Sequence, residues 1–366
     1  MSVLDHWHPV ALARDLGKKP LGVRLHGREI ALFRPQSGGV AAITDVCPHR
    51  RMRLSVGKVK GDCLECCYHG WTFAPDGSGE SPGTPKLRTH AQAYEAREAH
   101  GVLWVRNRGA TTQFPDFAGE DQGYRLMALL THDVSAPLEV VLDNFNELEH
   151  TPTTHGMFGY PLDRMHEVEA HFEPRDNEVA ISYDGPSKTY PWLFRMFMRL
   201  PRQPIFHVRG VTRYSPVHTF GDYHWTDPRN GQRSWVGVRN AHFLTPMDEQ
   251  NTRIFTFSYM KLKYPQLYPL LHVVRPIMRH SINKEVNEDK RVLDGLADKR
   301  PFLEGLKLSR FDRVLGLNRE RVERIYRGHG QKASPQACRC GSTEHHHVCD
   351  TGRQSTGASE SIGPAL

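Results

Sequence analysis

The sequence predicts an α+β chain, in which an antiparallel β domain precedes a domain that combines antiparallel strands with a long helix. Short alternating runs punctuated by glycine, such as GVRLHGREIALFR and GVAAITDVC, indicate strands and tight turns in the first part. Runs such as EVAISYDG and TRIFTFSYMKL indicate further antiparallel strands, and HSINKEVNEDKRVLDGLADK has the apolar spacing of a helix. We therefore predict domains over residues 1–112 and 113–330, followed by a flexible tail over 331–366.

Composition narrows the class of protein. The hydrophobic share of 38% and the charged share of 24% are typical of a soluble globular protein. No secretory signal is expected from the charged N-terminus, and no membrane span from the short apolar runs. The net charge of +7 comes without a nucleic-acid-binding motif, so no nucleic-acid partner is expected. The seven cysteines fall at 47–67 and 338–349, which suits metal chemistry in the reducing cytoplasm better than a disulfide framework.

Two short pairs of metal-binding residues lie near the start of the chain. Cys47 and His49 form the first pair, Cys66 and His69 form the second, and sixteen residues separate them. Two thiolates and two imidazoles are the ligands of a Rieske [2Fe–2S] cluster, in which one iron takes both sulfurs and the other takes both nitrogens. Zinc also binds two cysteines with two histidines, but its ribbons usually pair like with like at each knuckle. The mixed pairs favour the cluster, with zinc as the alternative.

The residues around these pairs have less specific roles. Choosing Cys63 or Cys67 as a ligand would break the spacing to His69, so both are expected to be bystanders. Trp71 is expected to pack over the cluster loop. A group of basic residues between the pairs could steer an acidic electron carrier to the cluster. The group consists of Arg50, Arg51, Arg53, Lys58 and Lys60.

A second stretch that carries chemistry is VVLDNFNELEHTPTTH, at residues 140–155. His150 and His155 are five residues apart, an offset of about 140° on an unbroken helix, so they would not share a face. Pro152 lies between them and is expected to kink or end the helix, which would turn His155 towards His150. Asn144, Glu147 and His150 follow at three-residue steps and are expected along one side of that helix.

Two histidines need a carboxylate to complete the facial triad that binds iron(II) and leaves coordination positions open. The later helix has an apolar stripe made of Ile282, Val286, Leu293 and Leu296. Asp289 falls within this stripe, where an acid is costly unless it is paired or bound to metal. We therefore predict Asp289 as the ligand, with a buried ion pair as the alternative. Glu285 borders the stripe as the runner-up ligand, and Glu288 is expected to be solvated.

These motifs together resemble a known family. Cys-Pro-His-Arg, Cys-Cys-Tyr-His-Gly-Trp, the block Asn-x₂-acid-x₂-His-x₄-His and a late Glu-Asp-Lys occur in the order found in Rieske non-haem iron oxygenases. Over roughly residues 5–300 the chain resembles their oxygenase (α) subunits, of the short type that includes dicamba monooxygenase and vanillate O-demethylase. The resemblance implies a helix-grip (START-like) catalytic domain, with a curved antiparallel sheet around a long helix. It also implies a homotrimer that lacks a small β subunit.

The resemblance also implies roles for the motif residues. The cluster would be held by Cys47, His49, Cys66 and His69, and the mononuclear iron by His150, His155 and Asp289. Glu147 takes the place of an aspartate that links a cluster histidine of one subunit to an iron-ligand histidine of the next. It is one methylene longer than that aspartate. Asn144 matches a position near the iron that hydrogen-bonds rather than ligates.

The implied activity is that of a terminal oxygenase. Such a protein takes electrons from an NAD(P)H-dependent reductase, directly or through a ferredoxin, and uses O₂ to hydroxylate or demethylate an aromatic or similar small organic substrate. A cis-dihydroxylating dioxygenase of the same family is one alternative, and an electron carrier, which would not need the second metal triad, is another. Two segments have open interpretations. YPWLFRMFMRLP at 190–201 could be pocket lining, core or subunit interface, and the Cys and His residues of the tail could bind a further metal.

Overall fold

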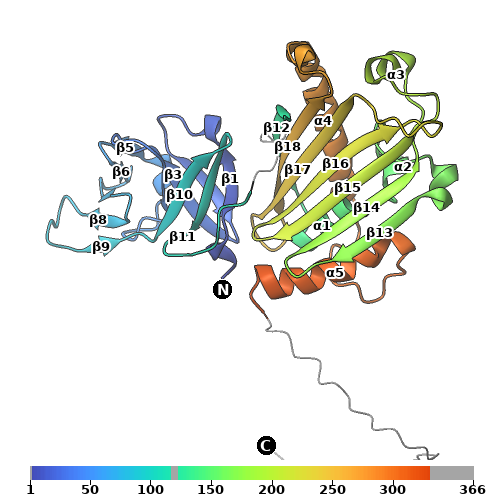
Figure 1. Cartoon of the computed structure of the whole chain (residues 1–366). Coiled ribbons are helices and arrows are strands. Elements are labelled where there is room, and N and C mark those ends of the chain that lie inside the picture. Colours follow the sequence, from blue (N-terminus) through green and yellow to red (C-terminus); the bar gives the residue numbers. More distant parts are fainter. Residues whose placement is uncertain (1, 117–122, 330–366) are drawn as a thin grey trace, which may run out of the picture. The chain divides into compact units, whose positions relative to one another are not determined.

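The computed structural model describes residues 2–116 and 123–329, and it confirms the predicted α+β class (Figure 1). The predicted tail at 331–366, with its Cys and His residues, lies outside the described residues. Within the described ranges, no helix combines the length and the apolar character needed to cross a membrane.

Two antiparallel sheets make up the N-terminal part of the chain. The six-stranded sheet has the order β1 (His8–Leu12), β11 (Val102–Asn107), β10 (Ala93–Ala99), β4 (Ala41–Thr44), β3 (Arg28–Phe33) and β2 (Leu21–Leu25). The five-stranded sheet has the order β5 (Lys58–Lys60), β6 (Cys63–Glu65), β7 (Thr72–Phe73), β8 (Ser78–Glu80) and β9 (Thr89–His90). Leu54, Leu64 and Phe73 form a core with the cysteines of the two Cys-His pairs, so the cluster loops rest on packed side chains.

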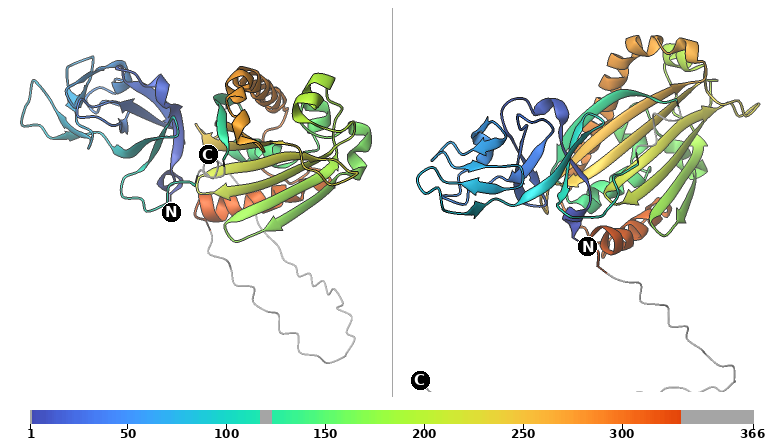
Figure 2. Two further views of the ribbon diagram at one scale, coloured as in Figure 1. Left: turned by 45° about the horizontal axis from the view of Figure 1, so that its top comes forward. Right: turned by 60° about the vertical axis from the view of Figure 1, so that its left-hand side comes forward.

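A seven-stranded antiparallel sheet dominates the rest of the chain. Its order is β12 (Arg125–Val134), β18 (Thr252–Leu262), β17 (Val236–Pro246), β16 (Val217–Thr226), β15 (Ile205–Tyr214), β14 (Glu178–Pro186) and β13 (Glu169–Pro174). The α-helices are α1 (Leu138–Asn146), α2 (Thr151–Thr154), α3 (Trp192–Met198), α4 (Leu270–Asp294) and α5 (Arg313–Arg321), and a π-helical turn at Val322–Tyr326 continues α5. Figures 1 and 2 show the sheet curving, with α1 and α4 against one of its faces, as the helix-grip prediction requires.

The predicted domain boundary falls in the connection between β11 and β12, of which residues 117–122 lie outside the described residues. The boundary itself stays a prediction. Short 3₁₀ helices occupy Val3–Asp5, Ala13–Asp15, Leu54–Val56, Leu162–Glu167, Pro265–Leu267 and Arg310–Asp312.

The long helix α4 carries most of the predicted apolar stripe. Ile282, Val286 and Leu293 are buried, and Asp289 is buried among them with 5% of its surface exposed. Leu296, in contrast, lies beyond the end of the helix and is 38% exposed, so its assignment to the stripe is wrong. The chain leaves the helix at Gly295, and the apolar spacing that continues to Leu296 no longer corresponds to one helical face.

The helix that precedes the two predicted iron histidines ends earlier than its sequence predicts. It stops at Asn146, and Glu147 has extended backbone (φ −94°, ψ 142°). The Glu147 carboxylate accepts hydrogen bonds from the backbone N–H groups of Glu149 (2.7 Å) and His150 (3.3 Å). These bonds stabilise a turn in place of a further helical turn. The expected single helix through His150 is therefore wrong.

Pro152 does not break this helix. It lies in the first turn of the short helix α2, where a residue without an N–H group is tolerated. His150 precedes α2 and His155 follows it, so one helical turn separates the two histidines. The two histidines do meet, but a turn ahead of Pro152 and the short α2 bring them together.

Candidate metal centres

Two loops of the same shape present the predicted cluster ligands. In each loop the cysteine N–H donates to the carbonyl oxygen five residues later, at 2.8 Å for Cys47 and 2.7 Å for Cys66. Each cysteine carbonyl accepts from the N–H four residues later, at 2.8 Å and 3.0 Å. The donors of this second bond, Arg51 and Gly70, both have positive φ (58° and 70°). Two tight turns of equal geometry therefore face one another.

The loops bring the four ligands together in matched pairs. Cys47 and Cys66 are almost fully buried and their thiols are in hydrogen-bond contact, and burial raises the pKa of the Cys47 thiol. The rings of His49 and His69 are exposed, with centroids 4.4 Å apart. Paired sulfurs inside and paired imidazoles outside fit a cluster with one iron on each side. The ligand assignment fits this geometry and stays a prediction.

The neighbours of the ligands behave largely as expected. The Trp71 ring stacks on His49, with centroids 4.8 Å apart and an interplanar angle of 7°, so it covers the cluster loop. Cys67 is exposed and Cys63 is half-buried on β6. Three of the five basic residues between the pairs have acidic partners: Lys58 and Lys60 pair with Glu65, and Arg53 lies near Glu29. Arg50 and Arg51 are exposed and have no ion pair among the described residues, so they keep a free charge beside the cluster loops.

His150, His155 and Asp289 converge on one point. The Nε2 atoms of the two histidines are 3.2 Å apart, and Asp289 Oδ1 lies 3.4 Å from the first and 3.1 Å from the second. Ligand atoms about 2.1 Å from a metal and about 90° apart would be about 3.0 Å from one another. The three atoms therefore have nearly the spacing of one octahedral face, which fits the iron(II) facial triad.

Carboxylates hold the far nitrogen of each imidazole. His150 Nδ1 donates to Glu147 Oε1 at 2.6 Å, which directs its Nε2 lone pair at the metal position. His155 Nδ1 lies 3.4 Å from Glu285 Oε2 and 3.6 Å from Glu288 Oε2. All three of these atoms are buried without a hydrogen bond to any described residue, so a small side-chain movement would give His155 an acceptor.

Glu285 and Glu288 differ from their expected roles. Glu285 is buried and accepts a hydrogen bond from the Met157 N–H (3.0 Å), and it faces the outer nitrogen of His155 and not the metal position. Burial raises the pKa of Glu285. The expectation that Glu288 is solvated is wrong, because its side chain is only 20% exposed and points to His155. The chain around α2 covers a part of α4 that would otherwise face water.

The surrounding carboxylates favour a protonated His150. Burial alone would lower the pKa of His150, but hydrogen bonds to Asp289 and Glu147 outweigh it and raise the pKa to about 9. Burial alone would raise the pKa of Asp289, but hydrogen bonds from the two histidines lower it to about 2. A metal ion at this position competes with the imidazolium proton, so metal binding releases a proton.

An apolar cavity of about 80 Å³ lies beside the triad. Its apolar wall consists of Phe145, Leu148, Phe158, Phe206, Val208, Tyr223, Ile282 and Val286. Besides the triad, five polar residues line it, and the described lining contains no Lys or Arg. The five are Asn144, Thr151, Asn240, His242 and Glu285. The Oδ1 atoms of both asparagines are buried without a hydrogen bond to a described residue. Amide and imidazole groups, with the Thr151 hydroxyl and the Glu285 carboxylate, would therefore meet any polar group of a bound molecule.

None of the described side chains of the aromatic segment at 190–201 lines this cavity. Tyr190 is buried and accepts a hydrogen bond from the Trp225 indole (3.0 Å). Trp192, Leu193 and Met196 of α3 are 67%, 57% and 63% exposed. The described side chains therefore do not support the pocket-lining interpretation. Tyr190, Met198 and Leu200 belong to the core, as one alternative expected, and the exposed residues lie at the surface.

Sequence reasoning missed three residues of the site. Lys188, from the connection between β14 and α3, donates to the backbone carbonyls of Thr151 and His155 and so fixes both ends of α2. No motif marks this lysine. Asn240 and His242 are two apart on β17 and so share a face, but strand alternation alone does not tell which face meets the iron site.

Both parts of the chain match known families. The family of the Rieske [2Fe-2S] domain matches residues 6–95, and the family of the vanillate O-demethylase oxygenase C-terminal domain matches residues 134–326. The dicamba O-demethylase oxygenase component of Stenotrophomonas maltophilia is 26% identical over 321 residues, 82% of this chain and 90% of that protein. The chloroacetanilide N-alkylformylase oxygenase component of Rhizorhabdus wittichii is 31% identical over 267 residues, 70% of this chain and 76% of that protein.

Solved structures share the fold. Dicamba monooxygenase bound to 3,6-dichlorosalicylic acid has a TM-score of 0.71 at 22% identity, covering 88% of this chain and 97% of that one. The NdmA QL mutant of Pseudomonas putida CBB5 with caffeine has a TM-score of 0.66 at 20% identity, covering 87% and 89%.

The fold and the two centres are those of a Rieske non-haem iron oxygenase, an oxidoreductase that carries a [2Fe–2S] cluster and mononuclear iron and uses O₂. Within this class, the chain belongs to the family of vanillate O-demethylase-type oxygenase components. Members of this family are enzymes, so the alternative of a non-enzymatic electron carrier is wrong. Oxygenase components receive their electrons from partner proteins.

Proposed function

We propose that this oxygenase oxidatively removes an O- or N-alkyl group, most simply a methyl group, from a small aromatic or similar organic compound. The observation that carries the proposal is that the facial triad opens onto an apolar cavity with a few hydrogen-bonding groups. Relatives named as an O-demethylase and an N-alkylformylase support dealkylation over ring dihydroxylation. The small cavity favours a substrate built on a single ring.

The residues would divide the work as follows. Cys47, His49, Cys66 and His69 hold the cluster, and His150, His155 and Asp289 hold the iron. When bound, the cluster supplies single electrons and the iron activates O₂. Glu147 fixes the orientation of His150, and the apolar wall keeps water from the reacting groups. Asn144 and Asn240 orient the substrate through their unpaired Oδ1 atoms, which can accept hydrogen bonds.

The proposal includes a homotrimer in which electrons pass between subunits. Within one chain, no hydrogen bond or ring contact of the described residues joins His69 to Glu147 or His150, so the cluster needs another acceptor. Glu147 in the next subunit would be that link. The exposed apolar residues of α3 and of the first half of α4, among them Val273 and Ile277, suit an interface between subunits. A cytoplasmic location also stays part of the proposal.

An aldehyde-release assay tests the reaction. With NADH, a reductase and a panel of methoxy- and N-methyl-substituted aromatic compounds, one O₂ and one NADH should yield one demethylated product, one formaldehyde and one water. Asp289→Ala should abolish the reaction and leave the cluster absorption spectrum unchanged. A diol that carries both atoms of ¹⁸O₂, formed without aldehyde, would instead identify a dioxygenase.

A further inference from the structure

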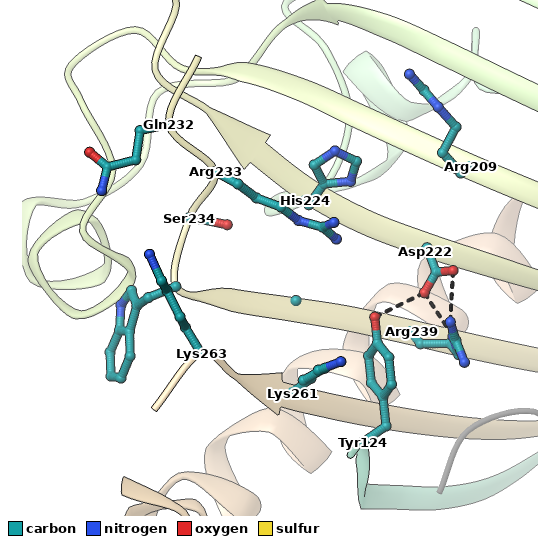
Figure 3. A pocket seen from close by; sticks show the side chains of 12 residues that line it. Tyr124, Arg209, Asp222, His224, Gln232, Arg233, Ser234, Arg239, Lys261 and Lys263 are labelled. Atoms are coloured by element: carbon teal, nitrogen blue, oxygen red, sulfur yellow. Dashed lines mark hydrogen bonds and ion pairs between the residues drawn. The ribbon is translucent and has the colours of Figure 1, made fainter. Parts of the chain in front are cut away.

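A second, larger pocket lies on the opposite face of the seven-stranded sheet. Its volume is about 520 Å³, and Figure 3 shows its lining. On β17, Asn240 and His242 line the iron-site cavity, whereas Gly237 and Arg239 line this pocket. Since successive side chains of a strand point to opposite faces, the sheet separates the two sites. No described residue lines both, so the second pocket is not an entrance to the first.

The pocket is strongly basic. Among the described residues, five cationic side chains line it, namely Arg209, Arg233, Arg239, Lys261 and Lys263, and Asp222 is the single carboxylate in that lining. Asp222 is already used: Arg239 donates to it at 2.7 Å and 3.0 Å, and the Tyr124 hydroxyl donates to it at 3.1 Å. Arg209 is paired with Asp184 at 2.7 Å.

Three cations remain without an acidic partner. Across residues 2–116 and 123–329, no carboxylate lies within ion-pair distance of Arg233, Lys261 or Lys263. Figure 3 shows all three side chains around the same hollow. Burial, and after it the charge of Arg233, lowers the pKa of the neighbouring His224 to about 4, so this imidazole adds no positive charge at neutral pH. Like charges held around a concave surface repel one another, and a bound anion would relieve that repulsion.

We propose that this pocket binds a small multivalent anion of the phosphate class, as a nucleotide or free pyrophosphate would present. An anion with several charges suits cations that come from separate elements, Arg233 from the β16–β17 loop and Lys261 from β18. Arg233 offers the planar fork that matches phosphate oxygens, and Lys261 and Lys263 act as point charges. Trp235 and Tyr124 add aromatic surface to the pocket wall. The ligand occupies a site distinct from the substrate site.

Calorimetric titration of the intact protein with inorganic pyrophosphate tests the proposal. We expect one pyrophosphate per chain, with binding weakened about tenfold or more in the double variant Arg233→Gln/Lys263→Gln. The control Lys18→Gln/Lys19→Gln removes the same charge from exposed lysines elsewhere and should bind as the wild type does. Oxygenase turnover should be unchanged in both variants, because neither alters the iron site.

Two results would overturn the proposal. One is equal, weak and salt-sensitive binding by the wild type and both double variants, which would indicate only a general ion atmosphere. The other is a rise in the KM for the reductase in Arg233→Gln/Lys263→Gln without any pyrophosphate binding, which would make the pocket a protein-docking surface. A nucleotide that binds at least as tightly as pyrophosphate in the same calorimetric titration would identify the larger ligand as the source of the phosphate group.

Discussion

At the scale of single residues, Asp289 and Glu285 lie one turn apart on α4 and face different atoms of the same histidine. Asp289 meets His155 Nε2 at 3.1 Å, and Glu285 approaches Nδ1 at 3.4 Å. Helical spacing alone left both as candidate ligands, because the sequence does not give the position of α2 across from the helix. The geometry separates a ligand from a residue that orients a ligand.

This difference gives the first prediction. Asp289→Ala should lose the mononuclear iron, whereas Glu285→Gln should keep the site but bind iron about 10- to 100-fold more weakly. Iron content and competition with a chelator measure both effects, and the cluster spectrum should not change. Glu304→Gln, an exposed acid, is the matched control. Equal iron loss in the Asp289 and Glu285 variants would show that both carboxylates bind the metal directly.

A second prediction concerns Glu147. Glu147→Ala should leave the cluster loaded and weaken iron binding, because Glu147 caps the turn and orients His150. In iron-saturated protein it should still slow the oxidation of the reduced cluster in a single turnover, since the proposed link between subunits is removed. Rapid mixing with O₂ and substrate, followed by the cluster absorbance, measures this rate. Glu149→Ala removes a nearby carboxylate that accepts from Ser309 instead, and it should be normal. A normal rate in the Glu147 variant would refute the bridging role.

At the scale of elements, the turn after α2 packs closely against the start of that helix, next to the iron site. Gly159 has φ of +107°, and a Cβ there would lie 2.3 Å from Thr151 Oγ1. Gly159→Ala should therefore lower the free energy of unfolding by roughly 1–3 kcal/mol and weaken iron binding, because Thr151 begins the helix that positions His155. Gly231→Ala is the control, since Gly231 also has positive φ (68°) but open space around it.

Denaturant titration and iron content compare the two variants. A larger loss in Gly159→Ala than in Gly231→Ala isolates the clash from the backbone strain that both share. Equal losses would mean that Thr151 moves aside at little cost.

The segment around α2 shows which parts of the site the sequence can predict and which it cannot. The cluster loops could be predicted because ligand chemistry demands Cys and His at short, fixed spacings. The metal triad could be predicted only as a set of residues. Its assembly depends on the Glu147 carboxylate capping a turn and on Lys188 reaching α2 from a distant connection. Neither contact follows a sequence period or a motif. The sequence therefore predicts that Pro152 ends the helix, whereas the Glu147 carboxylate stabilises the turn that ends it. For the same reason, the cover over Glu288 could not be foreseen.

The fold class was more accessible than the ends of its elements. Alternation along β14 is visible in the residues, because one face of that strand is buried, whereas β18 is buried on both faces along most of its length and shows its strand character through its β-branched and aromatic residues. The end of α4 at Gly295 and the exposure of Leu296 depend on what packs beyond the helix, which an apolar period does not report. The exposure of α3 has a similar cause. Its aromatic and apolar residues suggested burial, but within the described part of one chain no other element packs over its exposed side chains.

At the scale of the whole molecule, buried neutral histidines should make the fold sensitive to acid. His218 is fully buried, its Nδ1–H donates to the Pro216 carbonyl at 2.7 Å, and burial lowers its pKa to about 4. The unfolded chain takes up the proton near pH 6.5 and the folded chain near pH 4. Stability is therefore complete above about pH 6.5 and falls as the pH drops towards 4.

His218→Gln should make this dependence shallower. Between about pH 6 and pH 4.5 the slope of the unfolding free energy against pH should fall by about 1.4 kcal/mol per pH unit, which corresponds to one proton. Urea titrations at several pH values measure the slope, with the exposed His171 changed to Gln as the control. A slope equal to that of the wild type would mean that His218 does not titrate on unfolding.

Within the described part of one chain, no hydrogen bond or ring contact joins His69 to Glu147, and this bears on how mixtures of inactive chains behave. Under the proposed trimer, a Cys66→Ser chain cannot deliver electrons but keeps a sound iron site, and an Asp289→Ala chain has the opposite defect. Each variant produced alone should have no oxygenase activity. Produced in the same cell, the two should complement, because each mixed interface of the right order joins the intact cluster of one to the intact iron of the other. Two loss-of-function alleles would then restore part of the turnover, whereas electron transfer confined to one chain would restore none.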